Sequence, residues 1–462
     1  MIKNNNNSLF DLDGQPSFNR SFPIALQHLL AMIVGNSLPA LVLANALKGT
    51  PHEIAPEQSI YIIQAGMFLA AIATMIQLYP VLKFGAKLPV IMGVSFSYIP
   101  ILLQIGLKYG MPAVFGAEVV GGLVAIIVGM LIGKIRKFFP PIVSGTVVLT
   151  IGLSLYSVAI GYMAGGNGNP MYGSIYNWGV AILTLVVVLI CNMYGKGIIK
   201  LAAILVGMLV GYIVSIILNL TIAPGFINFT NAQNAAWFTF PKILPMGIEF
   251  VPSALFVMSI MFIVNSVQAV GDLSSTTIGG LDREATDVEI SGGITSMGLS
   301  SILGGFMGSL PTATYSQNVG IVSMTKVVAR KVLVITAAMI LIAGFIPKFG
   351  GVMMSIPQCV IGGATISVFA QITMNGMKLI TSEELSVRNS TIVGLGIALG
   401  MGVNSVKPAT ELLEAAHPTI HMILTSSPVI LATMVVFFLN IILPKKTIEE
   451  EQREREEIDK CN

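Results

Sequence analysis

Apolar stretches long enough to cross a lipid bilayer recur along almost the whole of this 462-residue chain. A helix needs about 20 predominantly apolar residues to span the hydrocarbon core, and such windows follow one another instead of appearing once at the N-terminus. The chain is 54% hydrophobic and only 10% charged, far less charged than a soluble domain. A membrane β-barrel would instead show segments of about 10 residues with alternating polarity. The sequence therefore predicts an all-α, polytopic membrane protein.

Charge clusters, prolines and glycines divide the apolar sequence into fourteen candidate transmembrane segments. They fall near residues 22–46, 57–80, 86–106, 112–134, 138–160, 174–195 and 197–220, and then near 250–272, 287–307, 310–326, 328–347, 351–376, 389–405 and 418–443. The first 20 residues lack an apolar core before a cleavage site, so no cleaved signal peptide is expected.

The basic residues support this count, because alternate loops of a fourteen-span chain lie on opposite sides of the membrane. One side would hold Lys83, Lys87, Lys134, Arg136, Lys137, Lys196, Lys200, Arg283, Lys326, Arg330, Lys331, Lys378 and Arg388. The other would hold only Lys48, Lys108, Lys242, Lys348 and Lys407. The positive-inside bias places the richer side, and with it both termini, in the cytoplasm. The expected location is the plasma (inner) membrane.

Two pairs of short matches indicate that the chain is an inverted repeat of seven segments. "PPIVSGTVVLTIG" from Pro140 resembles "PQCVIGGATISVF" from Pro357, and "LPVIMGVSFS" from Leu88 resembles "LPTATYSQNV" from Leu310. Each pair joins segments seven apart, the fifth to the twelfth and the third to the tenth. Inserting an odd number of spans twice inverts the second copy, a common construction among transporters.

The third and tenth segments are predicted to be interrupted by short extended stretches. After Pro311, hydroxyl and other residues alternate as far as Gln317, a period-two pattern, before helix resumes at Val319 or Gly320. The repeat mate, residues 94–97, would face this stretch. Irregular backbone at membrane depth is tolerated only against protein or a wet cavity, and paired interruptions in two halves point to a substrate site. The alternative is that Gln317 and Asn318 only join helices through buried amides.

At "ALQHLLAM" and "SQNVGIVSMTK" the chain resembles the nucleobase-ascorbate transporter family. The family's tenth-segment signature is Gln, Glu or Pro, then Asn-x-Gly, four residues, and Thr followed by Lys, Arg or Gly. The signature positions are filled by Gln317, Asn318, Gly320, Thr325 and Lys326, and the first-segment Gln-His by Gln27 and His28. The resemblance extends from about residue 20 to about residue 445.

The resemblance implies a fold of two intertwined repeats, divided into a core domain and a gate domain, in a homodimer. The core would comprise residues 21–135 (segments 1–4) and 250–348 (segments 8–11), and the gate residues 136–249 and 349–444. Residues 1–20 would be a cytoplasmic N-terminal tail and residues 445–462 a charged cytoplasmic C-terminal tail.

The resemblance also implies a site for a purine base. Gln317 corresponds to the residue that reads the base, because an amide offers both a donor and an acceptor to an oxopurine edge. Ser316 and Phe96 would present backbone groups, and the Phe96 ring would stack on the base. Ser95, which replaces the Asn of xanthine-restricted relatives, points to xanthine with urate accepted. Asn318 and Gln268 complete the expected substrate-binding set.

Ion coupling departs from the family pattern at two positions. The eighth-segment position that is usually Glu is Gln268, and the ninth-segment position that is often Asp is Met297. The remaining candidates for coupling or for organising the site are Asp272 at the end of the eighth segment, Glu118 and His28. Each of these residues has an alternative role. Asp272 would be solvated near the cytoplasmic mouth, and Glu118 would face the outer aqueous cavity or bond a neighbouring helix. His28 would make a structural hydrogen bond that holds the first segment to the core.

The predicted activity is secondary active import of a purine base, xanthine or urate, by symport with a cation, a proton rather than sodium. Core movement against the gate would alternate access, and Thr425 and Ser427 in the last segment would act as gate residues or cap local backbone. The alternatives are an anion exchanger of the related seven-plus-seven fold and a carrier of uracil or another nucleobase. No cofactor, metal or nucleic-acid partner is expected, and an enzyme is disfavoured because no HExxH, Cys/His cluster or carboxylate pair is present.

Overall fold

A computed structural model describes residues 8–135, 138–166, 168–412, 421, 424–425, 427–444, 448–450 and 452–453. Arg136, Lys137 and most of the charged C-terminal tail lie outside the described residues. The chain divides into two compact units. Unit 1 consists of Met1–Ile132 and Val158–Ser367, and unit 2 consists of Gly133–Ser157 and Val368–Asn462.

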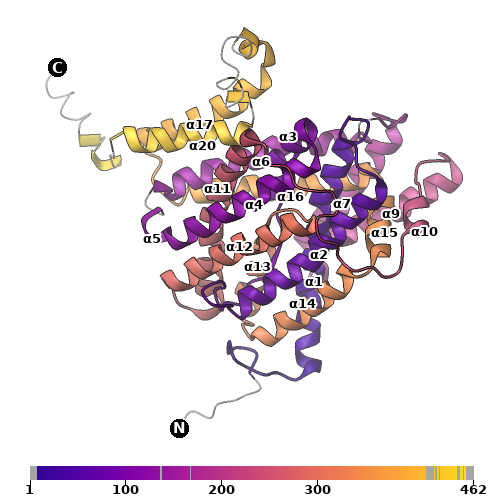
Figure 1. Ribbon diagram of the computed structural model, residues 1–462, viewed down its shortest axis with the longest axis horizontal. Coiled ribbons are helices and arrows are strands. Elements are labelled where there is room, and N and C mark those ends of the chain that lie inside the picture. Colours follow the sequence, from indigo (N-terminus) through magenta and orange to yellow (C-terminus); the bar gives the residue numbers. More distant parts are fainter. Residues whose placement is uncertain are drawn as a thin grey trace. The chain divides into compact units, whose positions relative to one another are not determined.

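Unit 1 is a helical body (Figure 1), and its described residues include a two-stranded sheet. Its helices are α1 (Phe18–Leu47), α2 (Pro56–Leu78), α3 (Ile99–Tyr109), α4 (Met111–Met130), α7 (Ile175–Tyr194), α8 (Ile198–Leu201), α9 (Ala203–Thr221), α10 (Thr230–Asn234), α11 (Pro252–Leu281), α12 (Asp287–Met307), α13 (Ser316–Thr325), α14 (Arg330–Gly344) and α15 (Pro347–Ser355). The strands are β1 (Met92–Val94) and β2 (Thr312–Thr314), and a 3-10 turn, η1, covers Phe96–Tyr98.

Unit 2 contains the helix α17 (Val387–Ser405), the 3-10 turn η3 (Lys407–Thr410) and the helix α20 (Pro428–Ile442). The short helix α5 (Ile132–Ile135) and the longer helices α6 (Pro141–Met163) and α16 (Gln358–Ile380) contribute residues to both units. Within unit 2, Arg388 on α17 donates to the backbone oxygen atoms of Asn440 and Leu443 at 2.7 and 3.1 Å. This contact fastens the beginning of α17 to the end of α20.

The all-α, polytopic prediction is confirmed. Among the described residues, nine helices are long and apolar enough to cross a membrane, and α14 with α15 form a further pair bent by 77°. Pro347 lies at the first position of α15, where the missing N–H costs no helical hydrogen bond. The count of fourteen segments stays a prediction.

Helix boundaries differ from the sequence-based expectation at the eighth segment. The expected helix ended at Asp272, but α11 continues to Leu281 and ends where Asp282 adopts a left-handed φ of 52°. Hydroxyl groups in the extra turns bond the helix's own carbonyl groups, as Thr276 does to the Asp272 oxygen at 2.8 Å. Polar residues that satisfy their own helix in this way do not end it.

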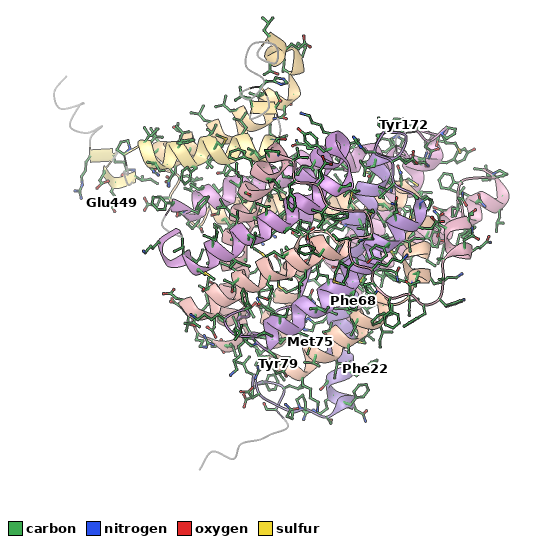
Figure 2. The ribbon with its side chains drawn as sticks, in the orientation of Figure 1. Phe22, Phe68, Met75, Tyr79, Tyr172 and Glu449 are labelled. Carbon is green, nitrogen blue, oxygen red and sulfur yellow. The ribbon has the colours of Figure 1, made fainter. Side chains whose placement is uncertain are left out.

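The described part of the N-terminal tail packs against the body of unit 1. The N–H groups of Val328 and Ala329, just before α14, donate to the Leu9 carbonyl oxygen at 3.0 and 3.1 Å. Arg330 pairs with Asp13 and donates to the Leu78 carbonyl oxygen at 2.9 Å. Its guanidinium also lies 4.7 Å from the ring centroid of Tyr79, a residue labelled in Figure 2. Residues 8–13 therefore cap a helix whose first N–H groups lack helical partners.

The helices α4 and α12 cross with almost no side chain between them. A Cβ atom at Gly122 would lie 2.6 Å from the Gly298 carbonyl oxygen, and one at Gly298 would lie 2.5 Å from the Gly122 oxygen. Small residues at such a crossing allow two membrane helices to approach closely, which increases their van der Waals contact.

We expect Gly122→Ala to lower the free energy of unfolding by about 1–3 kcal/mol, the usual cost of overpacking a closely packed contact. The thermal unfolding midpoint of the detergent-solubilised protein measures the change. The matched control is Gly179→Ala on α7, because no described atom lies within 4 Å of a Cβ built there. Equal stability of the two variants would contradict the close crossing.

Candidate functional site

Two interrupted segments meet inside unit 1 as a short antiparallel pair. Met92, Gly93 and Val94 pair with Thr314, Ala313 and Thr312. The pairing continues at both ends, because the Ser95 N–H donates to the Pro311 oxygen at 3.1 Å and the Tyr315 N–H donates to the Ile91 oxygen at 3.0 Å. The prediction that the third and tenth segments contain extended stretches that face each other is confirmed.

The limits of these stretches differ from the prediction. β1 begins two residues before the expected stretch 94–97 and ends at its first residue, and the second half of that stretch belongs to the turn η1. Helix α13 begins at Ser316, earlier than Val319 or Gly320. The hydroxyl of Ser95 caps η1 by accepting a hydrogen bond from the Ser97 N–H at 3.2 Å, and this local bond ends the extended run.

Side chains from the surrounding helices bond the outer edges of the two strands. The Val94 N–H donates to Asn36 Oδ1 of α1 at 2.7 Å, and the Met92 N–H donates to Thr74 Oγ1 of α2 at 3.0 Å. On the other strand, the Thr312 N–H donates to Ser301 Oγ of α12 at 3.2 Å. An unpaired N–H inside a membrane costs several kcal/mol, so these three side chains permit the irregular backbone.

Gln317 is the second residue of α13, and its side chain is half-buried. No hydrogen bond to its amide is present within the described part of the chain. The first N–H groups of α13 have no helical partners, and together with the helix dipole they favour polar or negative groups at this end. The structure therefore has an uncommitted amide at a polar helix terminus.

Ser316 and Asp272 tie the beginning of α13 to α11. Asp272 lies in the interior of α11 and accepts hydrogen bonds from Ser316 Oγ at 2.8 Å and Thr314 Oγ1 at 2.6 Å. The expected position at the end of a helix is wrong, and the carboxylate bonds the turn between β2 and α13, as an organising role requires. It fixes the residues on either side of Tyr315.

Gln268 lies one turn before Asp272 on α11 and reaches the other interrupted segment. Its Oε1 accepts a hydrogen bond from Ser97 Oγ at 3.1 Å. Phe96, beside Ser97, and Ser95 are both buried, 7% and 9% exposed. The structure therefore links the β1–η1 segment and α11 through residues that the sequence analysis assigned to one site.

Asn318 and His28 are brought together away from Asp272. The Asn318 amide donates to the His28 carbonyl oxygen at 3.0 Å and lies 3.0 Å from His28 Nδ1. Both side chains are buried. This contact joins α13 to α1 and gives His28 the structural hydrogen bond that was one of its two predicted roles.

Glu118 is completely buried on α4, and neither of its oxygen atoms has a hydrogen-bond partner among the described residues. The two alternatives for Glu118, a side chain facing an aqueous cavity and one bonded to a neighbouring helix, therefore differ from its position among the described residues.

In unit 2, Ser427 caps α20 by accepting from the Val429 N–H at 3.2 Å, and the Thr425 hydroxyl bonds the His421 oxygen at 2.7 Å. Both gate candidates thus make local backbone bonds.

Sequence reasoning missed the residues that support the site. Asn36 is an amide in the middle of a predicted membrane helix, and this was the available signal. Gly35 and Gly93 were also missed, although a Cβ at either would lie 2.8 Å from an atom of the Tyr315 side chain. Their lack of a side chain makes room for Tyr315 between α1 and β1.

We expect Asn36→Ala to lower the free energy of unfolding by about 1–3 kcal/mol, because it leaves the buried Val94 N–H without an acceptor. The matched control is the neighbouring Ser37→Ala, since the Ser37 hydroxyl bonds only the Ile33 oxygen of its own helix. Thermal unfolding in detergent measures both. A smaller loss for Asn36→Ala than for Ser37→Ala would contradict the role of Asn36 at the strand edge.

Comparisons with solved structures relate the fold to anion transporters. The transmembrane domain of the cyanobacterial bicarbonate transporter BicA matches with a TM-score of 0.58 at 14% identity, covering 92% of this chain and 98% of that one. The murine Slc26a9 anion transporter in the inward-facing state matches with a TM-score of 0.63 at 10% identity, covering 91% and 68%. At these identities the likeness concerns the fold alone.

Comparisons of sequence relate the chain to permeases. The sequence model of a protein family described as a permease family matches residues 19–409 of this chain. A Clostridium perfringens chain provisionally named a purine permease is 34% identical over 95% of this chain and 93% of its own length. The xanthine permease of Bacillus subtilis is 30% identical over 94% and 97%. The nucleobase transporter PlUacP of Paenibacillus larvae is 31% identical over 91% and 93%. The chain belongs to the nucleobase-ascorbate transporter family, whose members are permeases and not enzymes.

Proposed function

We propose that this protein imports a purine base, xanthine or urate, across the plasma membrane. The names of its relatives support a nucleobase substrate, since they include xanthine and uric acid permeases. The observation that carries the proposal is the uncommitted, half-buried amide of Gln317 at the beginning of α13. An amide with two donors and one acceptor matches a ring N–H beside a carbonyl, the edge that an oxopurine presents.

The surrounding residues suit a flat, polar, uncharged ligand. Phe96 offers an aromatic face, and aromatic rings stack on bases of any sequence. Gln268 has amide N–H groups that its bond from Ser97 leaves available as donors. Ser95 and Ser316 lie at the ends of the two strands and complete the set. Asn318 belongs to it as a positioning residue, because its amide holds α13 to α1.

Transport would proceed by symport with a cation, a proton rather than sodium, and by an elevator-type movement. In this scheme the core, residues 21–135 and 250–348, carries the site past the gate, residues 136–249 and 349–444. The full arrangement would have fourteen membrane segments, cytoplasmic termini and a homodimer. The interrupted segments on which the scheme depends are supported by the β1–β2 pairing. Asp272 and His28 would organise the site, since each holds α13 by side-chain bonds.

An anion exchanger is the second candidate, and one observation favours it. The α13 terminus, whose first N–H groups lack helical partners, is a polar end of the kind that attracts anions. Against it, two side chains of α11 accept hydrogen bonds from the interrupted segments, the Asp272 carboxylate from Thr314 and the neutral Gln268 amide from Ser97. A carboxylate beside the site disfavours an inorganic anion.

Gln317→Ala is expected to weaken xanthine binding at least roughly tenfold, because polar groups of the base lose their partners. Uptake of labelled xanthine, urate, guanine, hypoxanthine and uracil into proteoliposomes measures the effect. The control is Gln371→Ala, which removes an exposed amide from α16. Unchanged affinity in Gln317→Ala would reject the site. Sulfate or bicarbonate flux in wild type, with no uptake of any base, would establish the exchanger instead.

A further inference from the structure

Glu118 has an environment that a carboxylate charge would not tolerate. Its exposed fraction is 0%, and neither oxygen has a partner in the described part of the chain. Moving an unpaired carboxylate out of water costs far more than binding a proton to it. Burial without a partner therefore favours the neutral, protonated form of this carboxyl group.

The fold leaves room for this carboxyl group between α4 and α12. A Cβ atom at Gly304 would lie 2.6 Å from Glu118 Oε1 and 2.7 Å from the Leu69 side chain. Met297 lies seven residues before Gly304, two turns away on the same face of α12. The carboxyl group thus occupies a space made by a missing side chain in the same interface where Gly122 and Gly298 meet.

A line of side chains joins this space to the candidate substrate site. Phe262 of α11 lies against Gly121, one turn after Glu118 on α4, and its ring centroid is 4.8 Å from that of Tyr98. The Tyr98 hydroxyl accepts a hydrogen bond from Asn265 at 2.9 Å. Asn265 lies three residues before Gln268, so the two are neighbours on one face of α11. Gln268 in turn bonds Ser97, which precedes Tyr98 in η1. A displacement of Ser97 or Gln268 by a ligand would therefore be felt at Tyr98 and Asn265.

The other titratable and charged groups on the packed elements have separate places. Asp272 on α11 is bonded to Thr314 and Ser316, and Glu289 in the first turn of α12 pairs with Arg283 at 2.5 Å. The rest lie near the ends of their helices or in the loop before α11: Asp287 on α12, Lys108 and Tyr109 on α3, Glu57 and Tyr61 on α2, and the exposed Glu249, whose backbone packs against α4 at Gly116.

We propose that Glu118 is the proton-binding site that couples purine uptake to the proton gradient. This inference rests on the function proposed above. A proton from the outer solution binds the Glu118 carboxylate as the base binds, and the neutral carboxyl crosses with the core. After the base has left, the carboxyl releases the proton to the inner solution. One base and one proton enter per cycle, and the neutral side chains Gln268 and Met297 carry no proton.

Glu118→Gln tests the proposal, because glutamine keeps the size of the side chain and binds no proton. In proteoliposomes with the membrane voltage clamped to zero, an inward proton gradient of about one pH unit should drive roughly tenfold accumulation of labelled xanthine by wild type. Glu118→Gln should equilibrate xanthine without accumulation, while xanthine counterflow stays within about twofold of wild type. Glu249→Gln, at a loop carboxylate, is the matched control and should accumulate xanthine like wild type.

Accumulation by Glu118→Gln equal to that of wild type would overturn the proposal. Absence of xanthine counterflow in wild type would instead overturn the proposed function, so the two failures are distinguishable. If Glu118→Gln lacks counterflow because it does not fold, infrared difference spectra of wild type decide. The proposal predicts that the band of a protonated carboxyl group changes when xanthine binds, and that the same change is seen in Asp272→Asn. If no such change is seen, the proposal for Glu118 is overturned.

Discussion

The rest of the site depends on one requirement: backbone N–H and C=O groups at membrane depth need partners inside the protein. Strands β1 and β2 meet this requirement for each other along one edge. Asn36, Thr74 and Ser301 meet it along the outer edges. Because these donors and acceptors come from α1, α2 and α12, the strand pair also fixes three helices around it. Because the backbone before Ser316 has its hydrogen bonds, helix α13 can begin in the interior of unit 1.

Polar side chains inside unit 1 support the assignments in two ways, through the bonds that some make and through the partners that Gln317 and Glu118 lack. Asp272 and Asn318 each make two hydrogen bonds and hold α13 in place from opposite neighbours, α11 and α1. Gln317 and Glu118 make none among the described residues. A polar group that lacks a partner away from water is costly, and for Gln317 and Glu118 a ligand and a proton would supply the missing partner. The hydrogen bonds of Asp272 and Asn318 thus support their structural roles, and the lack of such bonds at Gln317 and Glu118 supports the proposed functional roles.

Much of this fold could be predicted from sequence, because long apolar windows and repeated Leu-Pro motifs carry strong signals. The interrupted segments and the residues beside them were found in this way. The strand register was not, since the hydroxyl of Ser95 ends the extended run through a local bond that no periodicity reveals. The length of α11 was also missed, because Thr276 and Thr277 look like a helix end but bond their own helix. Asn36 was overlooked because its acceptor role depends on a strand 58 residues away.

Helix geometry explains why three neighbouring polar residues in α13 have different roles. Successive residues on an α-helix point about 100° apart, so a polar run cannot serve a single neighbour. Ser316 points to Asp272 on α11, and Asn318 points to His28 on α1. Gln317 lies between them in sequence, so its side chain leaves the helix about 100° away from each of theirs. The two anchored side chains thus fix the rotation of α13 about its axis, and that rotation leaves the Gln317 amide unpaired within the described residues.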